Sequence, residues 1–168
     1  NEKIYIIMIK KNLIIIFISI FFSFSVFSAG TDNSGSTKVN NFTKASNLIK
    51  QAKKYESKGK DKKAKKRFEK ALKYLLISNK KKPNQPDTLN YLGFTSRKIG
   101  NFEIAEKYYL EGLALDPNHF GINEYLGELY VNTNRITKAK ERLKVLENCN
   151  CKEFKELSDA IKQGKSKY

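Results

Sequence analysis

The chain has few of the residues from which catalytic and metal centres are usually built: its 168 residues include one His, two Cys and no Trp. One His and two Cys leave almost no material for a transition-metal site or a histidine-dependent catalytic centre. Three Pro and nine Gly are too few for a chain dominated by linkers. With 40% apolar and 30% charged residues, the composition is that of a globular protein. We therefore expect no metal, no cofactor and no enzymatic activity.

Acidic residues are also scarce, because 33 Lys and Arg stand against 17 Asp and Glu, for a formal net charge of +16. The excess is local. Residues 38–85 hold 17 basic and 3 acidic side chains, whereas residues 86–168 hold 13 and 12. A charge of this size invites a nucleic-acid partner, but aromatic residues are not interleaved with the cations. The sequence thus argues against nucleic acid.

The N-terminal segment has the three parts of a secretory signal peptide. Lys10 and Lys11 precede an apolar run, Leu13–Phe27, and small residues follow it. We expect a signal peptide over residues 1–28, with translation starting at Met8. The alternative is an uncleaved inner-membrane anchor, although a helix of fifteen residues spans only about 23 Å of a hydrocarbon core of roughly 30 Å.

Export would place the mature protein in the periplasm, away from cytosolic nucleic acid and where thiols can oxidise. Residues 29–42 are polar and small, which predicts a flexible linker between the export signal and the folded part.

A repeat of 34 residues organises the chain from residue 86 onward, in blocks 86–119 and 120–153. Each block predicts two helices joined by a turn, with Asn101 and Thr137 as N-caps of the second helices. Corresponding positions carry Leu92-Gly93 and Leu126-Gly127, Ala105 and Ala139, and Tyr109 and Leu143. This pattern resembles the tetratricopeptide repeat, a helix-turn-helix unit in which small residues let two helices approach closely.

The resemblance extends, more weakly, to a basic repeat over residues 43–85, whose second helix carries seven extra residues. Seven residues are two helical turns, so this insertion lengthens the helix without rotating its buried face. Residues 154–164 predict a closing helix. The expected fold is all-α, a solenoid of about three repeats with a C-terminal capping helix, preceded by the signal peptide.

In the tetratricopeptide family the first helices of the repeats line a concave groove that binds protein segments. Carried over residue by residue, the groove positions are Ser46, Ile49, Lys53, Glu56 and Ser57; Asp87, Asn90, Phe94, Arg97 and Lys98; and Gly121, Glu124, Glu128, Val131 and Asn132. Our candidate partner site comprises Asn90, Phe94, Arg97, Lys98, Glu124 and Glu128. Phe94 either faces solvent there or packs under the neighbouring helix, and these two readings remain open.

Two pairs of residues allow a chemical role as an alternative to a structural one. Glu124 and Glu128 stand four apart on one helix face, a spacing that suits a metal or an acid–base pair, but ion pairing with Arg97 and Lys98 is the simpler expectation. Cys149 and Cys151 flank one residue, so they form a tight disulfide, remain free thiols or hold a metal; we favour an oxidised structural clip over a redox catalyst.

These patterns predict a non-enzymatic scaffold of the bacterial cell envelope that binds a peptide or helix in the concave groove. The alternative is an adaptor for a membrane surface or cell wall, which would act through the basic first repeat. Its candidate basic face consists of Lys62, Lys63, Lys65, Lys66 and Arg67. Coding bias toward Lys is a third explanation of that charge.

Overall fold

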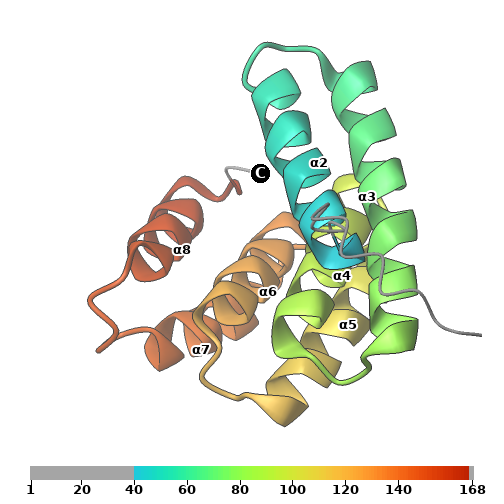
Figure 1. The fold of residues 1–168 in the computed structure, drawn as a ribbon. Helices are drawn as coiled ribbons and strands as arrows, with labels where there is room; N and C mark the ends of the chain where they lie inside the picture. The colour runs from blue at the N-terminus through green and yellow to red at the C-terminus, as the bar shows by residue number, and fades with distance from the viewer. Residues whose placement is uncertain (1–39, 167–168) are drawn as a thin grey trace, which may run out of the picture. The chain divides into compact units, whose positions relative to one another are not determined.

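The structure, a computed structural model, describes residues 40–166; the predicted signal peptide and residues 29–39 of the predicted linker lie outside them. Within that range the chain forms helices and no strand (Figure 1). The helices are α2 (Asn41–Glu56), α3 (Asp61–Lys81), α4 (Pro86–Lys98), α5 (Phe102–Leu115), α6 (Phe120–Asn132), α7 (Ile136–Val145) and α8 (Lys152–Gln163). None of these described helices has the length and apolar character needed to cross a membrane.

Helix α2 begins inside the segment that the sequence predicts as linker. The Asn40 side chain accepts a hydrogen bond of 2.8 Å from the Thr43 backbone N–H, which satisfies a donor at the helix start. The Phe42 ring lies 5.5 Å from that of Tyr91 in α4, so the first turn also packs. The predicted linker therefore extends two residues too far.

The long basic helix α3 covers 21 residues and includes the two-turn insertion. Its buried side chains are Ala64, Phe68, Ala71 and Leu75, which recur at intervals of four and three residues. That spacing keeps them on one face of the helix as far as Leu75. The insertion therefore lengthens α3 as predicted.

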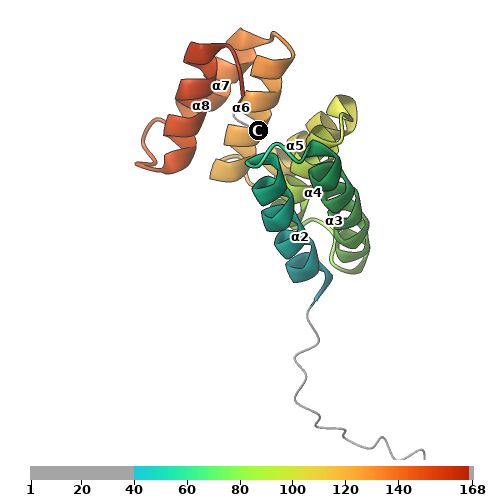
Figure 2. The same ribbon diagram turned by 90° about the horizontal axis from the view of Figure 1, so that it is seen from above.

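The helices pair as hairpins in chain order, α2 with α3, α4 with α5 and α6 with α7, and α8 packs on both α6 and α7 (Figures 1 and 2). Gly93 explains the close approach in the middle hairpin, because a Cβ at this position would lie 2.4 Å from the Tyr109 ring. The corresponding Gly127 does not face α7 as the repeat predicts. A Cβ there would lie 2.5 Å from the side chain of Leu157 in α8.

The turns inside the second and third repeats are equivalent. Gly100 and Asn134, 34 residues apart, both adopt left-handed backbone angles, with φ of 98° and 56°. Helix α7 then begins at Ile136, so the predicted N-cap at Thr137 is wrong. Asn101 does occupy the N-cap of α5, but its side chain makes no capping hydrogen bond.

His119 has a structural role at the start of α6. Its Nδ1 accepts a hydrogen bond of 3.2 Å from the Ile122 backbone N–H. Its Nε2 lies 3.2 Å from a carboxylate oxygen of Asp87, at the start of α4. The ring thus caps one first helix and links it to the preceding one.

The first helices of successive repeats form the inner side of the stack. Helix α2 contacts α4 and α4 contacts α6, whereas within the described residues α3 makes no contact with α5, nor α5 with α7. Closer spacing of one set of helices than of the other curves the stack toward the first set. We call the side formed by α2, α4 and α6 the concave side.

Candidate functional site

Five of the six residues predicted to line an open groove are buried. Asn90 is 8% exposed, Phe94 0%, Arg97 3%, Glu124 1% and Glu128 0%. Only Lys98 keeps partial exposure. The expectation that these side chains present an open groove floor is therefore wrong, and they form the polar core beneath the concave side.

Phe94 is buried because side chains from the helices on both sides close over it. The Phe68 ring meets it edge-on at 5.8 Å, and the Tyr125 ring lies at 4.8 Å. The Lys53 ammonium lies 4.6 Å from its centroid, within cation–π range. Of the two readings open in the sequence, the structure selects packing under neighbouring helices.

Arg97 and Glu128 form an ion pair, with Nη2 and Oε2 2.7 Å apart. Burial opposes the charge on Arg97, but Tyr109 and Glu128 next to it outweigh that effect, so the Arg97 pKa is raised. Lys98 does not pair with Glu124; its ammonium instead contacts the carboxylate of Glu56 at the end of α2. The expected ion pairing across repeats is thus present, but Lys98 pairs with Glu56 and not with Glu124.

Glu124 has a different environment from Glu128. Burial raises the Glu124 pKa to about 9, and a hydrogen bond with Glu156 of α8 and the negative charge of Glu128 act in the same direction. At neutral pH, Glu124 is therefore protonated, and its O–H donates a hydrogen bond to a carboxyl oxygen of Glu156. This pair joins α6 to α8. Within the described residues no group of three potential ligands could hold a metal.

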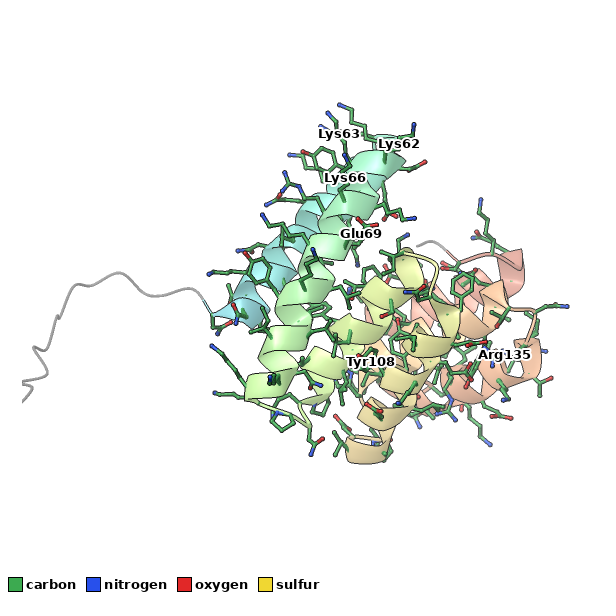
Figure 3. The ribbon with its side chains drawn as sticks, turned by 90° about the vertical axis from the view of Figure 1, so that its right-hand side faces the viewer. Lys62, Lys63, Lys66, Glu69, Tyr108 and Arg135 are labelled. Carbon is green, nitrogen blue, oxygen red and sulfur yellow. A yellow bond between two sulfur atoms is a disulfide. The ribbon has the colours of Figure 1, made fainter. Side chains whose placement is uncertain are left out.

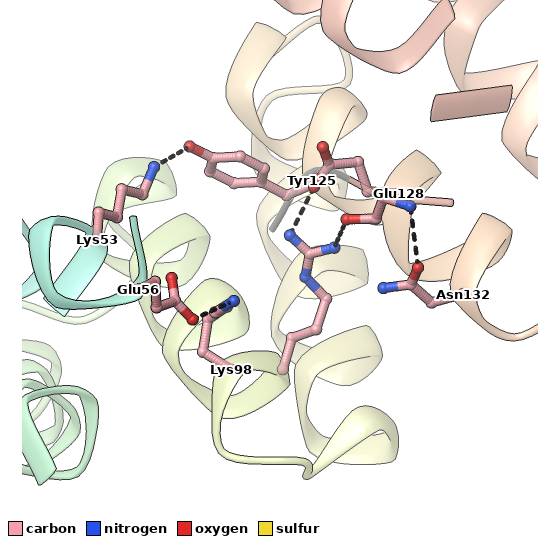
Figure 4. A network of polar contacts seen from close by, with 8 residues as sticks. Lys53, Glu56, Lys98, Tyr125, Glu128 and Asn132 are labelled. Atoms are coloured by element: carbon pink, nitrogen blue, oxygen red, sulfur yellow. Dashed lines mark hydrogen bonds and ion pairs between the residues drawn. The ribbon is translucent and has the colours of Figure 1, made fainter. Parts of the chain in front are cut away.

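Lys53 connects the first repeat to the third. Its ammonium donates a hydrogen bond of 3.2 Å to the Tyr125 hydroxyl. Burial lowers its pKa despite the opposing influence of Glu124. Figure 4 shows the resulting set of contacts, which we call the concave network: Lys53, Glu56, Arg97, Lys98, Tyr125, Glu128, Asn132 and Ser166.

The concave network reaches a segment outside any helix. Arg97 Nη1 donates a hydrogen bond of 3.2 Å to the Ser166 hydroxyl oxygen. The Ser166 backbone N–H donates to the Asn132 side-chain oxygen at 3.3 Å. Ser166 is only 8% exposed, so this contact shields it from solvent. Ser166, which follows α8, therefore lies on the concave side.

The predicted basic face lies at the beginning of α3. Lys62, Lys63, Lys65 and Lys66 are exposed and Arg67 is half-buried. Figure 3 shows Lys62, Lys63 and Lys66 projecting outward from this helix, away from Tyr108 and Arg135. Among the described residues, no ion pair is recorded for these four lysines.

Cys149 and Cys151 form a disulfide, with Cα atoms 5.1 Å apart. Asn150 between them has a left-handed φ of 48°, which turns the chain sharply enough to bring the two sulfurs together. The bridge lies at the join between α7 and α8, where it closes a short turn.

Sequence reasoning identified part of this site. Lys53, Glu56 and Asn132 stand at groove positions carried over from the repeat, but they were not singled out. Tyr125 and Ser166 were missed. An aromatic residue one position before Leu126-Gly127 gives no sign of its inward direction, and nothing in the repeat pattern places residues beyond α8.

Comparison with known proteins supports the fold. Residues 86–119 match the family model described as "Tetratricopeptide repeat". A curated relative, "Uncharacterized protein ycf37" of Guillardia theta, is 35% identical over 52 residues, 31% of this chain and 29% of that protein. This chain thus spans less than a third of the length of that relative.

Solved structures of the Yersinia enterocolitica type III secretion translocator chaperone SycD are also similar. One, in an alternative dimer, has a TM-score of 0.51 at 20% identity and covers 71% of this chain and 87% of that one. Another has a TM-score of 0.51 at 15% identity, covering 71% and 81%. At these identities the likeness concerns the fold alone.

Proposed function

We propose that this chain, which belongs to the tetratricopeptide repeat proteins through residues 86–119 and its all-α repeat fold, is a scaffold that binds a protein segment on its concave side. The matching family is one of repeat units. The scaffold function is non-enzymatic, and the binding energy comes from side chains contributed by several repeats.

The concave network is the observation that supports this proposal. Side chains from α2, α4 and α6 meet there, and the network already hydrogen-bonds a non-helical segment at Ser166. Because Phe94 and Tyr125 fill the floor, there is little depth for the side chains of a docked helix. An extended peptide, which needs hydrogen-bonding groups along an edge, fits this surface better.

Site-specific photo-crosslinking in cells tests the binding surface. A photoreactive amino acid replaces Asn132, an exposed residue of the concave network, and in a matched control it replaces Lys140, an exposed residue of α7. We expect a discrete protein adduct from position 132 that position 140 does not give. Identical adducts from both positions, or none from position 132, would contradict a concave binding site.

The identified partner then permits a quantitative measurement. Asn132→Ala removes one hydrogen-bonding side chain and should weaken binding by about 1 kcal/mol, roughly fivefold. Lys140→Ala should leave the affinity unchanged. Equal effects of the two substitutions would place the contact elsewhere.

We also propose that the protein acts in the cell envelope, as an exported, periplasmic protein. The support is the basic, apolar and small-residue pattern of residues 10–28. Cell fractionation combined with the intact mass of the recovered protein tests it: a periplasmic chain beginning at Ala29 is expected. A chain retaining Leu13–Phe27 in the membrane fraction would favour the anchored form, and cytosolic recovery would contradict export.

The second candidate function, an adaptor for an anionic membrane surface or cell wall, is favoured by the exposed lysines of α3. Each Lys near an anionic leaflet contributes about 1 kcal/mol. Co-sedimentation with phosphatidylglycerol vesicles tests it, using a variant with Lys62, Lys63, Lys65 and Lys66 changed to Gln. A control changes Lys138, Lys140, Lys144 and Lys155, which carry the same total charge on α7 and α8. Selective loss in the first variant supports the adaptor, whereas equal loss indicates attraction by net charge alone.

A further inference from the structure

The chain beyond α8 is directed back onto the stack. Gly164 ends the helix with a left-handed φ of 63°, and the Lys165 N–H donates a hydrogen bond to the Ala160 carbonyl. This pairing is typical of a helix C-terminus that stops and turns. The next residue, Ser166, is buried at 8% exposure although it belongs to no helix.

Ser166 bridges two repeats through both its backbone and its side chain. Its hydroxyl oxygen accepts from Arg97 of α4, 69 residues earlier, and its N–H donates to Asn132, 34 residues earlier. Figure 4 shows Asn132 and Glu128 side by side at this edge. Two side chains thus hold Ser166: that of Asn132 accepts from its backbone N–H, and that of Arg97 donates to its hydroxyl oxygen.

The charge balance at this edge defines the kind of segment that fits. Glu128 already neutralises Arg97 at 2.7 Å, and Glu56 pairs with Lys98. An acidic side chain would approach the Glu128 carboxylate without meeting an uncompensated cation, whereas a hydroxyl accepts from Arg97 at no electrostatic cost. A small, neutral hydroxyl side chain is therefore the preferred occupant.

From this geometry we infer that Ser166, positioned by the end of α8, is an intramolecular occupant of the binding site, which a partner must displace with an extended segment carrying Ser or Thr. This inference rests on the proposed function. A tethered segment has an effective concentration on the order of millimolar. A partner should consequently bind the intact chain more weakly than a chain that lacks Ser166.

The test needs no knowledge of the partner, because the chain supplies its own probe. The protein variant ends at Lys165, which keeps α8 and its terminating hydrogen bonds, and the probe is an acetylated peptide with the sequence Gly-Lys-Ser-Lys-Tyr of residues 164–168. Titration is followed through the NMR signals of the Asn132 side-chain amide and the Arg97 guanidinium. We expect the peptide to shift both signals in the shortened chain, and to bind the intact chain at least fivefold more weakly.

Two controls identify the contacts. A peptide with Ala in place of Ser should bind the shortened chain several-fold more weakly, and Asn132→Ala in that chain should weaken binding of the original peptide. Hydrogen exchange provides a further check. In the folded intact chain, the Ser166 backbone amide should exchange at least tenfold more slowly than the Lys162 backbone amide does in the unfolded chain. A cooperative thermal unfolding transition and unchanged helical circular dichroism verify the fold of the shortened chain.

Equal binding to both chains, no binding to the shortened chain at 10 mM peptide (about the upper limit of tethered concentrations), or an unprotected Ser166 amide would overturn the inference. These results do not depend on a partner. If position 132 crosslinks to a partner but the peptide does not bind, the proposed scaffold function is supported and the proposal of an intramolecular occupant is wrong. If the peptide binds but no partner crosslinks, the intramolecular occupant is supported and the proposed scaffold function is not.

Discussion

Arg97 and Glu128 form a buried ion pair between the first helices of consecutive repeats, with side chains 1% and 0% exposed. Their sequence separation of 31 residues is close to one repeat length, so the pair fixes how α4 and α6 stack. Within residues 40–166, the Arg97 Nε and Glu128 Oε1 atoms have no hydrogen-bond partner. A buried pair satisfied only in part specifies the stacking more than it stabilises it.

Removing one member of this pair should destabilise the fold strongly. Arg97→Met leaves the Glu128 carboxylate buried without a counter-charge, and we expect a loss of about 3–5 kcal/mol in the free energy of unfolding. The double variant Arg97→Met/Glu128→Leu removes both charges and should recover most of that loss. Urea unfolding of the wild type, of the single variants Arg97→Met and Glu128→Leu and of the double variant measures it. Losses that simply add in the double variant would show that the two charges do not interact.

Stability should fall as the pH rises above about 5. Glu124 has an ordinary pKa of 4.5 and a folded-state pKa of about 9. Between these pH values the folded chain holds a proton that the unfolded chain has lost. The free energy of unfolding therefore falls by up to about 1.4 kcal/mol for each unit by which the pH rises. Below the lower value the two states bind the proton equally and the slope vanishes.

Glu124→Gln isolates this effect, because the neutral amide can still donate to Glu156. We expect a flatter stability profile from pH 5 to 9 and a variant more stable than wild type at pH 8. Glu141→Gln, at an exposed site on α7, is the matched control and should retain the wild-type slope. Parallel profiles for all three chains would exclude a protonated Glu124.

Gly127 should tolerate no larger residue unless α8 is altered as well. A Cβ at this position meets Leu157 at 2.5 Å, so Gly127→Ala should cost about 1–3 kcal/mol by overpacking. Leu157→Ala leaves a cavity, and the double variant should be more stable than the sum of the two losses predicts. A double-mutant cycle by chemical denaturation provides the coupling energy. A coupling of zero would argue against this contact between α6 and α8.

The disulfide between Cys149 and Cys151 should contribute little to stability. It closes a loop with a sequence separation of 2, for which loop-closure entropy gives about 1.5 kcal/mol. Reduction with dithiothreitol, or the Cys149→Ser/Cys151→Ser variant, should thus lower the melting temperature by a few degrees and leave the helical circular dichroism intact. Loss of the helical signal on reduction would mean that the bridge is required for folding.

The repeat architecture could be predicted because it depends on local spacing. Gly93 admits the Tyr109 ring, Ala105 and Ala139 are fully buried, and the turns at Gly100 and Asn134 recur at the predicted interval. Each of these features concerns residues within one hairpin, where helix periodicity fixes which side chains meet. The insertion also lengthens α3, as predicted, to 21 residues.

The binding surface could be predicted only in part. The repeat pattern gives the direction of a position relative to its own helix, but the burial of Phe94 depends on Phe68 and Tyr125 from other hairpins. Likewise, Lys98 pairs with Glu56 although Glu124 stands at an equally suitable groove position. Such choices depend on the curvature of the stack, which sums small rotations between repeats.

The helical repeat architecture, the confinement of the positive charge to one repeat and the positions of the hairpin turns all follow from the amino-acid sequence. The closed middle of the concave side, the proton on Glu124 and the contacts of Ser166 with Arg97 and Asn132 follow from the stacking of the repeats. The two groups of features differ in the range of the interactions behind them. Periodicity and turn chemistry act within a few residues, whereas burial, protonation and groove occupancy depend on side chains that are distant in sequence and come together only when the repeats stack.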